Sequence, residues 1–548
     1  MKRAIALLLL AACTHHAQPV PMRQLGKDAY AHYLNGRFAI YKEDYATAVT
    51  ELQAAIAAAP DQPTFAIELA HALAKAKRVP EANAVMTDAR AKWPDHSQVW
   101  LVSGELLEKD QPADAARAYR RSIELEDGDE KPYLGLVRIA IAQKDDRQAE
   151  VELRQLVAKV PTSTDGHYKL AQRLTGDDQI KELRIVLEQD PDQIDARLDL
   201  ARALRRSGKL DEAIVQTRNA FDRAAQPLDI ADELFWLLCE ADDRQAAIDL
   251  LTLLDDDRSD LDALATVLRM DLGLGRITEA QEIVARVAAQ DAEAGALAQA
   301  ELHLSTLELD KKGEPLAVAD VAAIPEDSQR FPQARRIAAL ALVAAQQPQR
   351  ALEMLEPVRK AKPKDLELAF IAATAAADSG AVEDGRALLK SFGDTLDAQL
   401  ARARFEDHVH AEDAALKLLV PIVTAHPDNS TALNLAGYLL ADRKQDLDRA
   451  EQLLKHAREL SPGDPAVLDS WGWLLLQRGR TRDAIRALDH ASRFSPREPE
   501  ILLHLATAWA ADKQPKTAAK LLDQAVALRP LPDVKRRIDA LRSTLVIK

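Results

Sequence analysis

The sequence predicts an all-α solenoid of about fifteen helix hairpins stacked side by side. Prolines that close apolar helical segments recur every 34 or 35 residues, a spacing typical of helical repeats. Alanine and leucine, both strong helix formers, dominate, and aromatic residues make up only 4%. The 548 residues are too many for one compact core. The recurring prolines are Pro60, Pro94, Pro427, Pro462, Pro496 and Pro530.

The clearest repeat unit runs from Pro465 to Pro496. Small residues in its first helix allow the second helix to approach closely, and large apolar residues pack into the neighbouring hairpin. Because no hairpin buries its apolar face alone, stacking supplies the core. The residues that carry the pattern are Leu468, Trp471, Gly472, Leu475, Ala484, Leu488 and Ala491, and the preceding unit repeats it with Ala436, Gly437, Leu440, Ala450, Leu454 and Ala457.

This pattern resembles the tetratricopeptide repeat, in which W-x₂-L-G-x₂-Y in the first helix is followed by A-x₃-F in the second and a closing proline. The resemblance implies a right-handed superhelical solenoid of tetratricopeptide-like hairpins. Another helical solenoid, such as HEAT, has a period of about 40–47 residues, which fits badly. We expect a final helix, about residues 532–546, to cap the open end and to turn Lys535, Arg536, Arg537 and Arg542 toward water.

The chain divides by pattern into six segments. Between the regular blocks the proline spacing drifts, which indicates degenerate repeats and short insertions. The predicted segments are a signal peptide (1–12), a lipidated tether (13–26), N-terminal repeats (27–239), degenerate repeats (240–428), well-formed repeats (429–530) and the capping helix (531–548).

The first residues predict export and lipid attachment. Lys2 and Arg3 precede a short apolar run that ends at Cys13, the arrangement of a secretory signal. The run is too short to span a bilayer. Leu10-Ala11-Ala12-Cys13 resembles the bacterial lipobox, which implies a diacylglycerol-modified Cys13; the alternatives are an ordinary secretory signal or a misassigned start codon. The residue after Cys13 is Thr14. In Gram-negative lipoproteins an aspartate at this position resembles an inner-membrane retention signal, so its absence favours the outer membrane.

Polar and aromatic residues on two neighbouring first helices form the candidate partner-binding site. Within each helix they are spaced by four, so they share one stripe, and the two stripes should be neighbours in a concave groove. Aromatic rings supply contact area, while amides and carboxylates satisfy the backbone of a bound peptide. The candidate residues are Asn434, Tyr438, Asp442, Asp469, Trp473 and Gln477. For Tyr438 and Trp473 the alternative role is packing against the next helix. A weaker candidate, for binding a carboxylate, is the cluster Arg202, Arg205 and Arg206.

Motifs of catalysis are absent from the sequence. It contains no phosphate-binding loop, nucleophile elbow, C-x-x-C or H-E-x-x-H. We therefore expect no enzyme activity, no cofactor, no metal site and no small-molecule substrate. The net charge of −15 argues against nucleic acid as a partner, since binding it needs a basic surface. Cys239 follows an apolar run and is predicted to be a buried, inert residue.

The segment from Leu433 through Tyr438 to Leu468–Trp473, together with the lipobox, is similar to a group of proteobacterial tetratricopeptide-repeat lipoproteins of the outer membrane. One member is the lipoprotein adaptor that activates a periplasmic carboxyl-terminal processing protease. The resemblance implies a membrane-anchored scaffold that faces the periplasm and binds proteins or peptides, such as a protease or cell-wall enzyme and its substrates. The alternative is a structural assembly factor of an envelope machine, such as a secretion, pilus or outer-membrane insertion complex.

Overall fold

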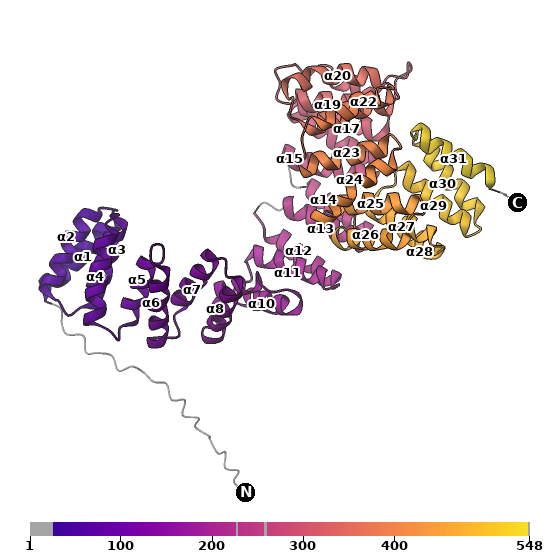
Figure 1. The fold of residues 1–548 in the computed structure, drawn as a ribbon. Helices are drawn as coiled ribbons and strands as arrows, with labels where there is room; N and C mark the ends of the chain where they lie inside the picture. The colour runs from indigo at the N-terminus through magenta and orange to yellow at the C-terminus, as the bar shows by residue number, and fades with distance from the viewer. Residues whose placement is uncertain (1–25, 226–227, 257–259, 546–548) are drawn as a thin grey trace, which may run out of the picture. The chain divides into compact units, whose positions relative to one another are not determined.

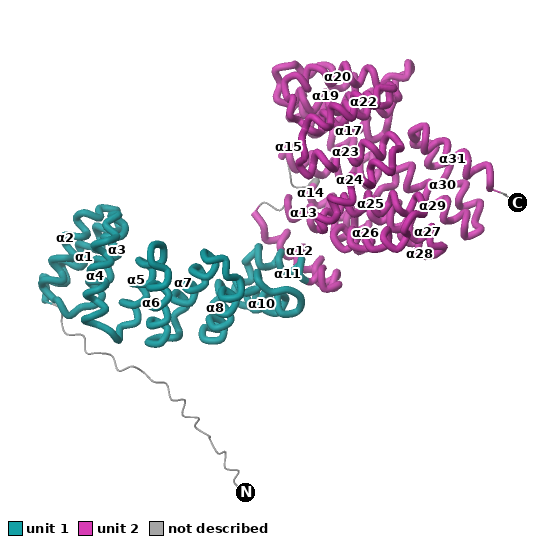
Figure 2. The backbone as a smooth tube through the Cα atoms, viewed as in Figure 1, with its two compact units in different colours: residues 1–203 teal, residues 204–548 magenta. Residues whose placement is uncertain are grey.

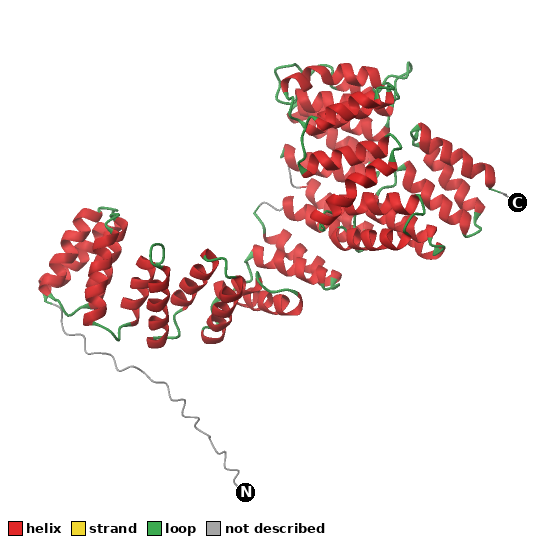
Figure 3. Cartoon of the chain, in the orientation of Figure 1, coloured by secondary structure: helices red, strands yellow, loops and turns green. Residues whose placement is uncertain are grey.

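The structure, a computed structural model, describes residues 26–225, 228–256 and 260–545. Within these residues the chain forms thirty-one helices and no strand beyond an isolated bridge between Leu309 and Pro315 (Figure 1, Figure 3). Successive helices pair as hairpins, which confirms the predicted all-α solenoid. The predicted signal peptide, the lipidated Cys13 and nearly all of the tether lie outside the described residues.

The chain divides into two compact units, residues 1–203 and 204–548 (Figure 2). The boundary falls inside α11. The helices of the first unit are α1 (Lys27–Tyr41), α2 (Tyr45–Ala58), α3 (Pro63–Lys75), α4 (Val79–Lys92), α5 (Ser97–Leu107), α6 (Pro112–Leu125), α7 (Glu130–Ala142), α8 (Asp146–Lys159), α9 (Thr164–Ala171), α10 (Gly176–Gln189) and most of α11 (Ile194–Arg206).

The second unit contains the remaining helices. The first ten are α12 (Leu210–Arg223), α13 (Leu228–Glu240), α14 (Arg244–Asp256), α15 (Leu261–Gly273), α16 (Ile277–Gln290), α17 (Ala292–Thr306), α18 (Leu316–Asp320), α19 (Phe331–Ala344), α20 (Pro348–Ala361) and α21 (Leu366–Asp378). The last ten are α22 (Val382–Lys390), α23 (Leu396–His408), α24 (Glu412–Ala425), α25 (Ser430–Asp442), α26 (Leu447–Leu460), α27 (Pro465–Gln477), α28 (Thr481–Phe494), α29 (Pro499–Ala511), α30 (Pro515–Ala527) and α31 (Pro532–Thr544). In the described residues no helix is both long and apolar enough to cross a bilayer.

The α27–α28 hairpin shows why the repeat pattern folds as it does. Asp464 caps α27 by accepting a hydrogen bond from the amide of Ala466, and Pro465 occupies the first turn, where no amide donor is needed. A Cβ on Gly472 would lie only 2.6 Å from the Cγ of Leu488, so glycine allows the two helices to touch. Gly437 has the same relation to Leu454, which confirms the close approach predicted for both glycines.

One hairpin of the second unit is incomplete. Helix α18 has only five residues, and α17 is followed by Leu307, whose left-handed backbone (φ 50°) turns the chain out of the helix. The hairpin lies within residues 240–428, where the repeat pattern is faintest. The degenerate sequence therefore still forms a hairpin that packs in the stack, but its second helix is short.

The second unit closes on itself, because its early helices meet its last repeats. The His490 side chain lies 2.7 Å from the carbonyl oxygen of Cys239, 251 residues away in the sequence. Gly463 sits so close to α13 that a Cβ there would be 2.7 Å from the carbonyl oxygen of Trp236. Arg244 also donates to the carbonyl oxygen of Arg493, at 3.1 Å. These contacts enclose space between α13–α15 and α25–α29.

Helix α31 covers the open end of the stack and buries Ile538 against α29 and α30. The sequence prediction for its basic residues is wrong for Arg537. Instead of facing water, this guanidinium donates to Glu500 at 2.6 Å and lies 3.0 Å from His504. The reason is electrostatic: the carboxylate of Glu500 and the buried ring of His504, both on α29, face the cap and take the half-buried guanidinium as their partner.

Candidate functional site

The two predicted stripes lie on α25 and α27 of the second unit. Asn434, Tyr438 and Asp442 belong to α25, and Asp469, Trp473 and Gln477 to α27. The stripes meet where the Nε1–H of Trp473 donates a hydrogen bond of 2.9 Å to Asp442. Their predicted neighbourhood is thereby confirmed, whereas their role in binding a partner stays a prediction.

Both aromatic rings of the predicted site pack against α29. The Trp473 ring stacks on His504 with 4.2 Å between centroids, and the hydroxyl of Tyr438 donates to Glu500 at 3.3 Å. Burial, reinforced by the charge of Glu500, raises the pKa of Tyr438, so the phenol remains protonated. The packing role that the sequence left open therefore exists for both residues, and a guest would meet rings that are already fixed in place.

A buried histidine, which the sequence reasoning missed, joins these residues into one network. His504 has no exposed surface, and its Nδ1 lies 3.0 Å from both carboxylate oxygens of Asp469. Its Nε2 faces Arg537, which can only donate, so we assign the proton to Nδ1. A signal was present in the sequence: His504 is the one polar residue in the apolar run Ile501–Ala506.

Carboxylates near this wall are partly desolvated and repel one another. Burial, together with the charge of Glu500 and then Glu412, raises the pKa of Asp407 on α23 to about 6. Burial, followed by Glu500 and Asp469, likewise raises the pKa of Glu498. Glu498 is exposed to solvent and lines a cavity, described below. Each shift indicates carboxylates that would gain from a nearby cation.

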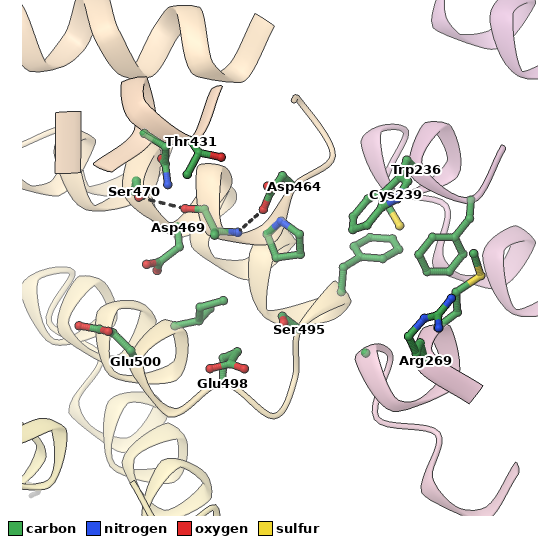
Figure 4. Close-up of a pocket in the computed structure, with 18 of the residues that line it drawn as sticks. Trp236, Cys239, Arg269, Thr431, Asp464, Asp469, Ser470, Ser495, Glu498 and Glu500 are labelled. Carbon is green, nitrogen blue, oxygen red and sulfur yellow. Dashed lines mark hydrogen bonds between the residues drawn. The ribbon is translucent and has the colours of Figure 1, made fainter. Parts of the chain in front are cut away.

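A cavity of about 690 Å³ separates this wall from α13 and α15. Figure 4 shows Asp469, Glu498 and Glu500 on one side and Trp236, Cys239 and Arg269 on the other. Of the six predicted residues, Asn434, Tyr438 and Asp469 line the cavity, and Asp442, Trp473 and Gln477 do not. Cavities of about 300–1,000 Å³ hold small ligands or a few side chains.

Two lining residues have special surroundings. The Oδ1 of Asn434 is buried and has no hydrogen-bond partner in the described part of the chain, a state that costs roughly 1–3 kcal/mol. Cys239 is fully buried, which confirms the burial predicted from sequence, and burial raises the pKa of its thiol to about 12. Among the predicted site residues, Asn434 therefore has a buried acceptor that could take a hydrogen bond from a bound partner.

In the weaker candidate, the arginine cluster at 202–206, one arginine already binds a carboxylate of the chain itself. Arg205 donates to Glu240 at 2.6 Å, so its carboxylate partner is intramolecular. Within the described residues, no group of three or more His, Cys, Asp and Glu side chains is placed to hold a metal ion.

Family comparisons identify the repeat class of this chain. Two family models, both described as tetratricopeptide repeat, match residues 39–104, 106–173, 180–229, 338–392, 413–465 and 470–531. Together these segments cover more than half of the sequence. The chain belongs to the tetratricopeptide-repeat family. The segment from 230 to 337 lies between the matched ranges of this tetratricopeptide-repeat protein, and it contains α15 and most of α13, which form one wall of the cavity.

A curated relative supports the same class. A TPR repeat-containing protein of Pseudomonas aeruginosa is 34% identical over 125 residues, which is 23% of this chain. The match spans about a fifth (20%) of the relative's length.

Similar solved structures are more distant. The APC/C hetero-tetramer Cut9–Hcn1 aligns over 94% of this chain and 96% of the other, with 14% identity and a TM-score of 0.32. YrrB, a TPR protein with an unusual peptide-binding site, aligns over 33% of this chain and 96% of the other, with 16% identity and a TM-score of 0.28. Scores this low do not indicate a shared arrangement of the repeats.

Proposed function

We propose that this tetratricopeptide-repeat protein is a scaffold of the bacterial envelope, anchored in the outer membrane through Cys13 and facing the periplasm. It holds a partner protein in the hollow of its second unit and catalyses no reaction itself. The observation that carries the proposal is the cavity between α13–α15 and α25–α29, whose walls present fixed rings, unpaired carboxylates and the unsatisfied Asn434.

The tether and the cavity together explain how such a scaffold works. A lipid anchor confines the cavity to one surface, so that weak contacts become frequent encounters through a raised effective concentration. The lipoprotein resemblance supports a protease or cell-wall enzyme, with its substrates, as the proteins gathered there. A stable equimolar complex with components of a secretion, pilus or insertion machine would instead favour the assembly-factor role.

Site-specific photo-crosslinking tests the proposed binding surface. A photoreactive phenylalanine replaces Thr431, an exposed residue of α25 that lines the cavity, in the full-length protein expressed in its own bacterial host. The matched control carries the same group at Lys520, an exposed residue of α30 that does not line the cavity. We expect a crosslink from position 431 to an envelope protein, identified by mass spectrometry and reconstituted with purified components.

The outcome separates three cases. An envelope protease or cell-wall enzyme captured at 431 and absent at 520 supports the adaptor. Equimolar capture of a machine subunit selects the assembly factor. Equal capture at both positions, or none at 431, would show that the cavity is not the binding surface.

Lipid attachment has its own test. The Cys13→Ser variant is expected to lose radiolabelled palmitate and to leave the membrane fraction, since the anchor requires the acylated thiol. Cys239→Ser is the matched control. Cys239 is buried, so this variant should retain full labelling at Cys13. Palmitate incorporation that persists in Cys13→Ser would remove the anchor from the proposal.

A further inference from the structure

Two carboxylates in the cavity have no cation beside them. Neither Glu498 nor Asp232 makes an ion pair or a side-chain hydrogen bond within the described residues, although both line the cavity. Glu498 precedes α29 without capping it, so its carboxylate is free to meet a guest. The full set of acidic lining residues is Asp232, Asp464, Asp469, Glu498 and Glu500.

The two basic lining residues do not balance this set. The guanidinium of Arg404 lies over the Phe370 ring, 4.8 Å from its centroid. Arg269, on α15, donates to Thr266 at 3.2 Å and lies on the opposite side of the cavity from Glu498 and Glu500 (Figure 4). The cavity therefore has an acidic end toward α27 and α29.

An indole on α13 complements the acidic end. Trp236 is 43% exposed, although tryptophan is usually well buried, and it lies one helical turn after Asp232. Phe235 meets it edge to face, with 5.6 Å between ring centroids, and steadies its orientation. An exposed indole with a carboxylate on the same helix face suits a cation that also offers a flat surface.

The protein already places one arginine on this wall. Arg537 of the capping helix donates to Glu500 and faces His504, close to Tyr438. The wall thus binds a guanidinium within the chain, and a second one would find Glu498 unpaired nearby.

From this charge complementarity we propose that the cavity receives an arginine side chain from an extended segment of the partner protein. Its guanidinium lies between Glu498 and Trp236, its stem packs on the apolar lining near Met270 and Ile501, and Asn434 bonds the backbone of the segment. The inference rests on the proposed function, for which it names the recognised side chain. Arginine is preferred to lysine because its planar group both stacks on indole and pairs with carboxylates.

The test selects binders by chemistry alone. Random heptapeptides displayed on phage are panned on the purified full-length protein, on Glu498→Lys and on Glu353→Lys. Glu353 is an exposed glutamate of α20 in the same unit, outside the cavity, so its substitution makes the same change of charge. Circular dichroism and thermal unfolding check that both variants keep the wild-type fold.

We expect the wild type and Glu353→Lys to enrich arginine several-fold over the starting library, and Glu498→Lys to lose that enrichment. A synthesised consensus peptide should bind about tenfold more weakly when its arginine becomes citrulline, and also when Trp236 becomes leucine, because each change removes a charge-assisted or cation–π contact. Fluorescence anisotropy measures both effects.

Selected peptides without arginine, enrichment that survives Glu498→Lys, or no selected peptide at all would overturn the inference. Lysine enriched as strongly as arginine would also overturn it. These failures are distinct from failure of the proposed function: a partner crosslinked at Thr431 can coexist with peptides that lack arginine, and arginine peptides can bind although no envelope protein is captured.

Discussion

Replacing Tyr119 with alanine is expected to destabilise the first unit by about 3–5 kcal/mol, the usual cost of deleting a buried aromatic side chain. The ring is fully buried, wedged between two glycines. A Cβ on Gly104 or Gly135 would lie 2.6 Å or 2.4 Å from its carbons. The hydroxyl donates to Glu108 at 2.6 Å, and Arg138 pairs with the same carboxylate at 2.7 Å. Removal of the Tyr119 ring would leave a cavity between α5 and α7, where the facing glycines have no side chains to fill it.

Hydrogen exchange of the full chain measures this effect by region. In the first unit the helices pack against their neighbours along the chain, so protection should fall in α5–α8 and remain in α25–α30. Tyr119→Phe is the matched control: it keeps the ring and loses only the hydrogen bond, at a cost of about 1 kcal/mol. Unchanged protection of α5–α8 in Tyr119→Ala would show that the ring does not hold this part of the stack.

Local features of the fold could be predicted from the sequence because they are periodic. Gly437 and Gly472 each stand opposite a leucine one helix later, and the structure places both pairs in direct contact. The repeat length of about 34 residues, applied to the whole chain, likewise predicted about fifteen hairpins, in agreement with the thirty-one helices of the described residues. The Tyr119 contact escaped prediction because a tyrosine stands where units such as those of Leu454 and Leu488 carry leucine, and its two glycine neighbours belong to different hairpins.

Contacts between distant repeats could not be predicted, because a 34-residue period says nothing about which turns of the solenoid meet. Only the structure pairs His490 with Cys239 and places Trp236 opposite Glu498. The predicted stripes on α25 and α27 therefore account for part of one wall of the cavity. No residue of the opposite wall was predicted. Arg537 was misplaced for a related reason: a basic residue on a terminal helix normally faces water, and its partners, the buried His504 and the half-exposed Glu500, come from another repeat.

Substituting Gly463 with valine is expected to open the second unit where its early and late repeats meet. A Cβ at this position would lie 2.7 Å from the Trp236 carbonyl oxygen and 2.9 Å from the Glu240 nitrogen. Both are backbone atoms of a helix, which cannot move aside as a flexible side chain does, so we expect a cost of about 1–3 kcal/mol or more. The loss should fall on the α13 contact that closes the cavity.

Cys239 reports this opening, because in a Cys13→Ser background it is the sole thiol of the chain. Its buried, protonated state makes labelling slow, and Gly463→Val should accelerate the reaction with a thiol reagent roughly tenfold or more, since 1.4 kcal/mol corresponds to a factor of ten. Gly128→Val is the matched control: Gly128, like Gly463, directly precedes an aspartate that caps the next helix, yet a Cβ there meets nothing within 4 Å. Equal labelling rates in the two variants would mean that Gly463 acts only on its own turn, and that closure of the cavity depends on other contacts, such as His490 with Cys239.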